Sequence, residues 1–192
     1  YQVTQYSLRG ARRHNEDRVG VAERDNAVML AVADGLGGHR GGEVAAEILV
    51  QTLLHAFQSV RQPVIQRPSA FLALSILQAH HAIVTRGQEA QSTIEPRTTC
   101  VACFVQNGYA YWAHVGDSRL YLFRQNRFVL RTQDHTTIEE LHRDGLLTEA
   151  ELTQAKANAT AISIAKSQEA RNALNDDLLV IKGTQEAVAS SL

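Results

Sequence analysis

The chain has little cysteine, no excess of charge of either sign and no long apolar segment. Its two cysteines cannot supply a disulfide framework, which is typical of proteins from a reducing cytoplasm. The net charge of −1 gives no basic surface for nucleic acid or for an anionic membrane. The longest apolar run, Ala27 to Ala33, is far too short to cross a bilayer. We therefore expect a cytoplasmic protein that binds neither nucleic acid nor membrane.

Cys100 and Cys103 have the C-x-x-C spacing of a redox or zinc motif, but their surroundings argue against that function. The segment TTCVACFV is β-branched and apolar, which favours a strand. Residues i and i+3 of a strand point to opposite faces, so the two thiols should diverge. We expect both cysteines to be packed in the core.

Apolar periodicity predicts one α+β domain over residues 1–192, a length that can bury a sizeable core. Helices are predicted over residues 43–60 and 69–87, the second capped by Ser69. Short apolar runs predict strands over residues 18–21, 27–33, 99–106, 110–115, 119–123 and 127–131. The last four strands should form a meander.

Turn and capping signals lie between these predicted elements and at the starts of predicted helices. Asn107-Gly108 is a strong signal for a two-residue hairpin between the first two strands of the meander. Thr137-x-x-Glu140 and Thr148-x-x-Glu151 resemble the capping boxes that begin helices. The chain after residue 137 is therefore expected to be helical.

The segment AVADGLGGHRGGE, residues 31–43, has the composition of a binding site. A buried strand should end at Asp34, where an acid is costly unless something binds it. The glycines that follow let the chain turn sharply and expose main-chain oxygens. Carboxylate oxygens of Asp34 and the carbonyl oxygen of Gly35 are of the kind that Mg²⁺ and Mn²⁺ prefer. A glycine-rich turn whose aspartate accepts backbone hydrogen bonds is the alternative.

Further acidic motifs flank this segment in the sequence. RRHNEDR places Glu16 and Asp17 at the start of a short strand, although a charge run of this kind is commonly a solvated face. HVGDSR places Asp117 at what the apolar flanks indicate is a tight, buried corner. QDHT, residues 133–136, follows the last strand of the meander.

The order of these motifs resembles the PPM-type metal-dependent serine/threonine protein phosphatases. R-x-x-N-E-D, A-D-G-x-G-G-H, T-T, V-G-D-S-R and D-H-T follow one another between about residues 6 and 151, and D-G-x-G-G-H is the form of bacterial members. The resemblance implies a four-layer α-β-β-α sandwich of two antiparallel sheets flanked by helices. It also implies hydrolysis of phosphoserine and phosphothreonine in proteins, so phosphorylated proteins are expected partners, with a cognate serine/threonine kinase as a further one.

The resemblance implies a site for two or three Mg²⁺ or Mn²⁺ ions. Asp34 matches the carboxylate that bridges two ions, with the Gly35 carbonyl on one of them. Asp17, together with Glu16, matches the acids that complete a shell largely through water. Asp117 matches the acid that helps to hold an additional, weaker ion in bacterial members.

Two further matches concern the phosphate. Arg12 matches the arginine that grips the substrate phosphate, for which a planar guanidinium is suited. His39 matches the motif histidine that assists proton transfer, whereas His135 is expected to be a structural hydrogen-bonding residue. Because a pair of divalent ions activates water, no cysteine or serine nucleophile is required.

The chain departs from the family pattern after D-H-T. EELHRDGLLTEAEL resembles the helical flap of the family, but nothing between residues 158 and 175 replaces the later strand that ends in Asp-Gly. Asn175-Asp176-Asp177 and the apolar run after it resemble the final acid and closing strand. We expect a single domain that lacks a block between about 158 and 175, with Asp176 or Asp177 as a late metal ligand.

Two alternatives stay open at this point. Asp176 and Asp177 could instead begin a helix, where acids favour the positive end of the dipole. A shortened chain could be a catalytically inactive pseudophosphatase that binds phosphoproteins or a kinase partner. We favour a sequence from which residues are missing, because loss of central strands would expose a sheet edge.

Overall fold

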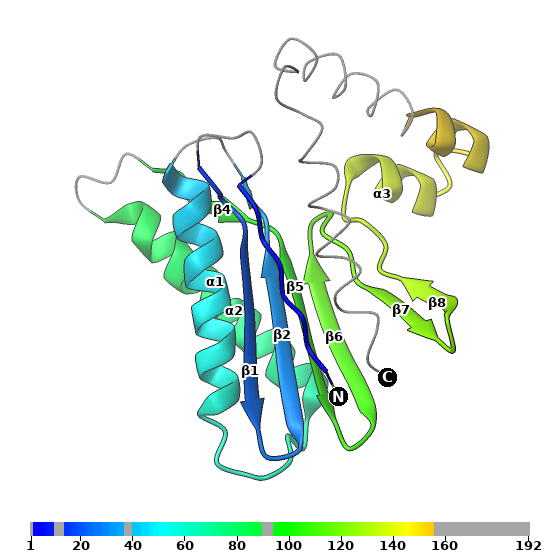
Figure 1. The fold of residues 1–192 in the computed structure, drawn as a ribbon. Helices are drawn as coiled ribbons and strands as arrows, with labels where there is room; N and C mark the ends of the chain where they lie inside the picture. Colours follow the sequence, from blue (N-terminus) through cyan, green and yellow to red (C-terminus); the bar gives the residue numbers. More distant parts are fainter. Residues whose placement is uncertain (1, 10–13, 37–39, 90–93, 156–192) are drawn as a thin grey trace. The chain divides into compact units, whose positions relative to one another are not determined.

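The computed structural model describes residues 2–9, 14–36, 40–89 and 94–155. The chain divides into two compact units (Figure 1). The larger unit is Asn15–Ser118, and the other combines Tyr1–His14 with Arg119–Leu192. Each unit is described separately.

The larger unit is built on a four-stranded antiparallel sheet in the order β1-β2-β5-β6. Its strands are β1 (Arg18–Arg24), β2 (Ala27–Ala33), β5 (Cys100–Gln106) and β6 (Tyr109–Val115). The predicted hairpin turn is confirmed, because Asn107 and Gly108 have φ values of 51° and 78° and join β5 to β6. A small second pair consists of β3 (Gly35–Leu36) and β4 (Arg97–Thr98).

Two helices, α1 (Arg40–Gln58) and α2 (Pro68–Gln88), lie together over one face of this sheet (Figure 1). The core lies between the helices and the sheet, where Phe57, Phe104, Met29 and Leu53 are fully buried. The predicted start of each helix was wrong. α1 begins at Arg40, with two glycines in its first turn. α2 begins at Pro68, and the residue at its cap position, Arg67, makes no side-chain capping hydrogen bond.

The two cysteines confirm the alternation expected of a strand. Cys100 belongs to the hydrophobic core under the helices together with Ala102 and Phe104, whereas Cys103 lies outside that cluster but is also buried. Both are free thiols. Burial raises the pKa of each thiol to about 12. The two cysteines of this C-x-x-C segment therefore serve as buried packing residues and not as a redox pair.

We expect Cys100 and Cys103 to be inert in the folded protein. At about pH 8 neither thiol should react with Ellman's reagent until denaturant is added, because the thiolate is the reactive form. The folded pKa of about 12 lies above the ordinary value of 9.0. Burial of the neutral thiols therefore contributes fully to the free energy of unfolding below pH 9.0. This contribution is lost as the pH rises to about 12, where the buried thiols ionise. Rapid labelling of the native protein would contradict this.

The second unit contains the hairpin of β7 (Tyr121–Arg124) and β8 (Arg127–Arg131), followed by α3 (Thr137–Arg143). The predicted four-stranded meander was therefore wrong in its second half. Within the described part of the chain, β7 and β8 pair only with each other. The chain leaves β6 through residues 116–120, which are not strand, and Gly116 at φ 98° turns it away.

The helix caps of this unit agree with one prediction and correct another. Thr148 and Glu151 form the predicted capping box, with Thr148 N–H donating to Glu151 Oε2 at 2.8 Å. The cap of α3 is Thr136, whose Oγ1 accepts from Glu139 N–H at 3.4 Å, and not Thr137 as predicted. No helix within the described ranges is long and apolar enough to cross a membrane.

Candidate metal centre

The strand ends that adjoin the acidic motifs of the larger unit lie at one end of its sheet (Figure 1). Arg18 at the start of β1 pairs with Ala33 at the end of β2, so Asp17 and Asp34 adjoin the same pair of residues. β5 begins and β6 ends at this same end of the sheet. Asp17 and Asp34 are both half-buried. The antiparallel register therefore brings together motifs that are far apart in the sequence.

The T-T motif fixes the main chain of Asp34. Asp34 N–H donates to Thr99 Oγ1 at 3.0 Å, and Thr99 N–H donates to the Asp34 carbonyl at 2.9 Å. The Thr98 hydroxyl donates to the same carbonyl at 3.0 Å. The backbone of Asp34 is thus held by Thr98 in β4 and by Thr99 between β4 and β5, independently of what its carboxylate binds.

The V-G-D-S-R turn lies beside this clamp. Thr99 Oγ1 and Ser118 Oγ are 2.6 Å apart and share a hydrogen bond. A Cβ atom on Gly116 would lie 2.9 Å from Thr99 Cγ2, so the turn packs closely on Thr99, the residue just before β5. The predicted corner is tight but not buried, because Asp117 is exposed.

Three backbone segments meet around Gly35. A Cβ atom at this position would lie 2.5 Å from the carbonyl carbon and oxygen of Gly42 and 2.6 Å from the carbonyl oxygen of Glu16. A Cβ atom on Gly42 would lie 3.0 Å from Glu16 Oε2. The glycines therefore let the D-G-x-G-G-H segment, the N-E-D segment and the first turn of α1 come into direct contact.

Glu16 is only 8% exposed, and its carboxylate lies beside the first turn of α1. Exposed N–H groups and the helix dipole favour a negative charge at this place. None of the hydrogen bonds or ion pairs found among the described residues involves this carboxylate. Glu16 and Asp17 are therefore adjacent acids in different surroundings, and Asp17 is the one aligned with Asp34 at the sheet end.

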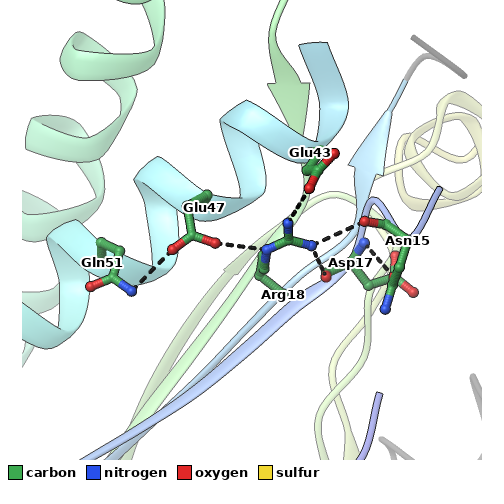
Figure 2. Close-up of polar contacts among 6 residues, drawn as sticks. All are labelled: Asn15, Asp17, Arg18, Glu43, Glu47 and Gln51. Carbon is green, nitrogen blue, oxygen red and sulfur yellow. Dashed lines mark hydrogen bonds and ion pairs between the residues drawn. The ribbon is translucent and has the colours of Figure 1, made fainter. Parts of the chain in front are cut away.

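Arg18 connects the N-E-D segment to α1 and was missed by the sequence reasoning as part of the site. Figure 2 shows its guanidinium between the backbone of Asn15 and Asp17 on one side and the side chains of Glu43 and Glu47 on the other. The only signal in the sequence was the position of Arg18 in a charge run. Its acidic partners, Glu43 and Glu47, lie one turn apart on α1, 25 and 29 residues after Arg18 in the sequence.

The D-H-T motif has a structural role in the second unit. Asp134 is 7% exposed and accepts two hydrogen bonds from Arg119, from Nε at 2.7 Å and from Nη2 at 2.6 Å. These hydrogen bonds raise the pKa of Arg119 above its ordinary value, although burial acts in the opposite direction. His135 is exposed. The pair joins the V-G-D-S-R motif to the D-H-T motif.

Several predicted site residues lie outside the described residues. They are Arg12, His39, Asp176 and Asp177, and the block expected to be missing between residues 158 and 175 falls in the same part of the chain. Among the residues that are described, no three His, Cys, Asp or Glu side chains form a group that could hold a metal ion. The ligand set therefore stays a prediction.

The residues at the sheet end nevertheless fit a hard divalent cation in their chemistry. Glu16, Asp17 and Asp34 supply carboxylate oxygens, the ligand type that Mg²⁺ and Mn²⁺ prefer. The close contact of Gly35 with Gly42 and Glu16 brings the segments that carry these acids together.

Comparison with known proteins agrees with this arrangement. A family model described as Protein phosphatase 2C matches residues 4–142. The serine/threonine phosphatase stp of Listeria welshimeri is 36% identical over 136 residues, which are 70% of this chain and 54% of that protein. The chain thus spans about half the length of the curated relatives it matches.

Solved structures give the same result. The serine/threonine phosphatase of S. agalactiae has a TM-score of 0.68 at 30% identity, over 78% of this chain and 62% of that one. The catalytic domain of the phosphatase PstP, solved in complex with two manganese ions, has a TM-score of 0.63 at 30% identity, over 76% and 61%. The predicted α+β sandwich of antiparallel sheets flanked by helices is confirmed. The chain belongs to the protein phosphatase 2C family.

Proposed function

We propose that the protein hydrolyses phosphoserine and phosphothreonine in other proteins with the help of divalent metal ions. The observation that carries the proposal is the alignment of Asp17 and Asp34 at one end of the sheet, where Thr98 and Thr99 hold the Asp34 backbone. Membership of the protein phosphatase 2C family and the names of the relatives support the same activity. The comparisons give no support to a non-catalytic protein.

Asp34 and Asp17 are the proposed principal metal ligands. The further proposed donors are Glu16, the Gly35 carbonyl, Asp117 and one of the late acids, Asp176 or Asp177. Bound divalent ions supply Lewis acidity, which lowers the pKa of a water molecule and offsets charge on the phosphoryl oxygens. The two manganese ions in the PstP structure support two Mg²⁺ or Mn²⁺ ions here. Asp117 is the proposed ligand of a third, weaker ion.

Arg12 and His39 have proposed roles toward the substrate. The guanidinium of Arg12 would bind two phosphoryl oxygens side by side and so orient the phosphate. The imidazole of His39 would hold or deliver a proton near the leaving hydroxyl group. His39 belongs to the same motif as Asp34, and Arg12 belongs to the motif that precedes it in the sequence, which supports their placement at the same site.

The remaining features of the proposal concern partners and organisation. Phosphorylated proteins are the proposed substrates, a cognate serine/threonine kinase is a proposed partner, and the cytoplasm is the proposed location. We also propose that residues 1–192 form a single phosphatase domain that lacks a block between about 158 and 175. The family match over residues 4–142 supports a phosphatase domain in that part of the chain.

Metal removal tests the proposed activity. The purified chain with Mn²⁺ should release phosphate from a phosphothreonine peptide, and excess chelator should reduce release to the level without protein, because the carboxylates alone cannot activate water. Renewed Mn²⁺ should restore activity. A circular dichroism spectrum with and without chelator controls for unfolding. Full activity in excess chelator, or peptide binding without turnover under every divalent ion, would contradict the proposal.

A further inference from the structure

We propose that Arg18 is a positioning residue that sets the affinity for divalent ions by fixing Asp17 relative to α1. The inference rests on the proposed function, because it concerns a ligand of the same site. It assigns a role to a residue that neither binds the ion nor touches the phosphate. Its basis is the set of hydrogen bonds around one guanidinium group (Figure 2).

Arg18 holds the backbone on both sides of Glu16. Its Nη1 donates to the carbonyl of Asn15 at 3.0 Å and to the carbonyl of Asp17 at 2.8 Å. Asp17 N–H in turn donates to Asn15 Oδ1 at 3.0 Å (Figure 2). These contacts close a small turn, in which the peptide groups that carry Asp17 have little freedom to rotate.

The other side of the guanidinium is anchored to α1. Nη2 of Arg18 donates to Glu43 Oε1 at 2.5 Å, and Nε donates to Glu47 Oε2 at 2.7 Å. Glu47 Oε1 also accepts from Gln51 Nε2 at 3.1 Å, which extends the chain of contacts along the helix (Figure 2). The same group therefore connects the turn before β1 with the helix whose first turn contains Gly42.

The N-E-D segment needs such a clamp because the sheet does not hold it. Residues 15–17 have no regular secondary structure, and ladder pairing begins only at Arg18. Asp34, by contrast, is held by hydrogen bonds from Thr98 and Thr99. Each of the two acids at the sheet end thus has its own clamp, and that of Asp17 is Arg18.

A lysine could not replace this arginine. The planar guanidinium fork presents N–H donors in several fixed directions, whereas a lysine ammonium is a compact charge on a flexible stem. Burial by itself would lower the pKa of Arg18, but hydrogen bonds to Glu47 and Glu43 outweigh it, so the pKa is raised. Arg18 therefore stays charged, and the fixed directions of its N–H groups are what position the segment that bears Asp17.

Loss of this clamp should affect metal binding more than stability. The Arg18 side chain is 26% exposed, and those of Glu43 and Glu47 are 43% and 48% exposed. Ion pairs of such exposure contribute little to stability, because solvent screens them. Removal of residues that orient metal ligands, by comparison, costs about 10- to 100-fold in affinity.

The test is calorimetric titration of Mn²⁺ into the full chain. We expect Arg18→Met to weaken Mn²⁺ binding by about 10- to 100-fold, and Arg18→Lys to recover little of it. Arg24 offers a matched control at the other end of β1, where it donates to the Gln62 carbonyl and lies over the Phe57 ring. Arg24→Met should bind Mn²⁺ as the unchanged protein does, even if its thermal stability falls.

The outcomes separate this inference from the proposed function. Equal Mn²⁺ affinity of the unchanged chain and of a folded Arg18→Met variant overturns the inference and leaves the phosphatase proposal intact. No Mn²⁺ binding by the unchanged chain overturns both. If Arg18→Met loses its native circular dichroism spectrum, the Glu43→Gln/Glu47→Gln double variant replaces it. That variant should also bind Mn²⁺ more weakly, and unchanged affinity would overturn the inference.

Discussion

Replacement of Asp34 by asparagine is expected to lower Mn²⁺-dependent hydrolysis of a phosphothreonine peptide by about 10³-fold or more. Asparagine keeps the size of the side chain but removes the negative charge that the proposed metal ligand supplies. The fold should survive, because the contacts that hold this residue to Thr98 and Thr99 come from its main chain. Steady-state kinetics, read as kcat/KM, measures the effect.

Asp25→Asn is the matched control for this change. Asp25 is exposed in the turn between β1 and β2, at the opposite end of both strands, and has φ 39°, which asparagine tolerates. The same chemical substitution should there leave kcat/KM unaltered. If the Asp34→Asn enzyme kept activity close to that of the Asp25→Asn enzyme, Asp34 would not be a metal ligand.

Gly35→Ala should be among the most damaging single-methyl changes in this chain. The new Cβ atom would lie 2.5 Å from the backbone of Gly42 and 2.6 Å from that of Glu16, and neither neighbour can rotate away as a side chain would. We expect a loss of about 3 kcal/mol in the free energy of unfolding, the upper end of ordinary overpacking costs. Urea titration followed by circular dichroism gives this quantity.

Gly108→Ala is the comparison variant, because it measures the cost of alanine in a left-handed backbone conformation without a steric contact. Gly108 has φ 78° and open space around it, so alanine there incurs only the cost of a left-handed residue, about 1–2 kcal/mol. Gly35→Ala should also weaken Mn²⁺ binding, because it separates the D-G-x-G-G-H segment from Glu16, whereas Gly108→Ala should not. Equal urea midpoints for the two variants would show that the contact at Gly35 can relax.

Local pattern predicted the strands of the sheet well and the helix starts poorly. Ala27–Ala33 was placed correctly because a buried apolar run bounded by turn residues leaves little choice. The start of α1 was set too late because Gly41 and Gly42 disfavour a helix by propensity. Contact with Gly35 and Glu16 requires a small residue at position 42, and this tertiary reason is invisible in a local pattern.

The candidate site shows the same division. Asp34 could be predicted at the end of a strand because it follows an apolar run. Its motif also indicated metal binding, because carboxylates suit divalent ions. The function of Arg18 depends on partners 25 and 29 residues away, and that of Thr99 on a partner 65 residues away. Which of many charged and hydroxyl groups meet across such distances is decided by strand register and helix placement.

The ion pair between Arg119 and Asp134 has an evolutionary consequence. It fastens together the two ends of the segment that contains β7 and β8, whose turn residues Gln125 and Asn126 are already left-handed. Additions or deletions at that hairpin tip leave the fastened ends where they are. The hairpin tip is therefore a place where the chain can change in length, and so present a different recognition surface, without disturbing the motifs on either side.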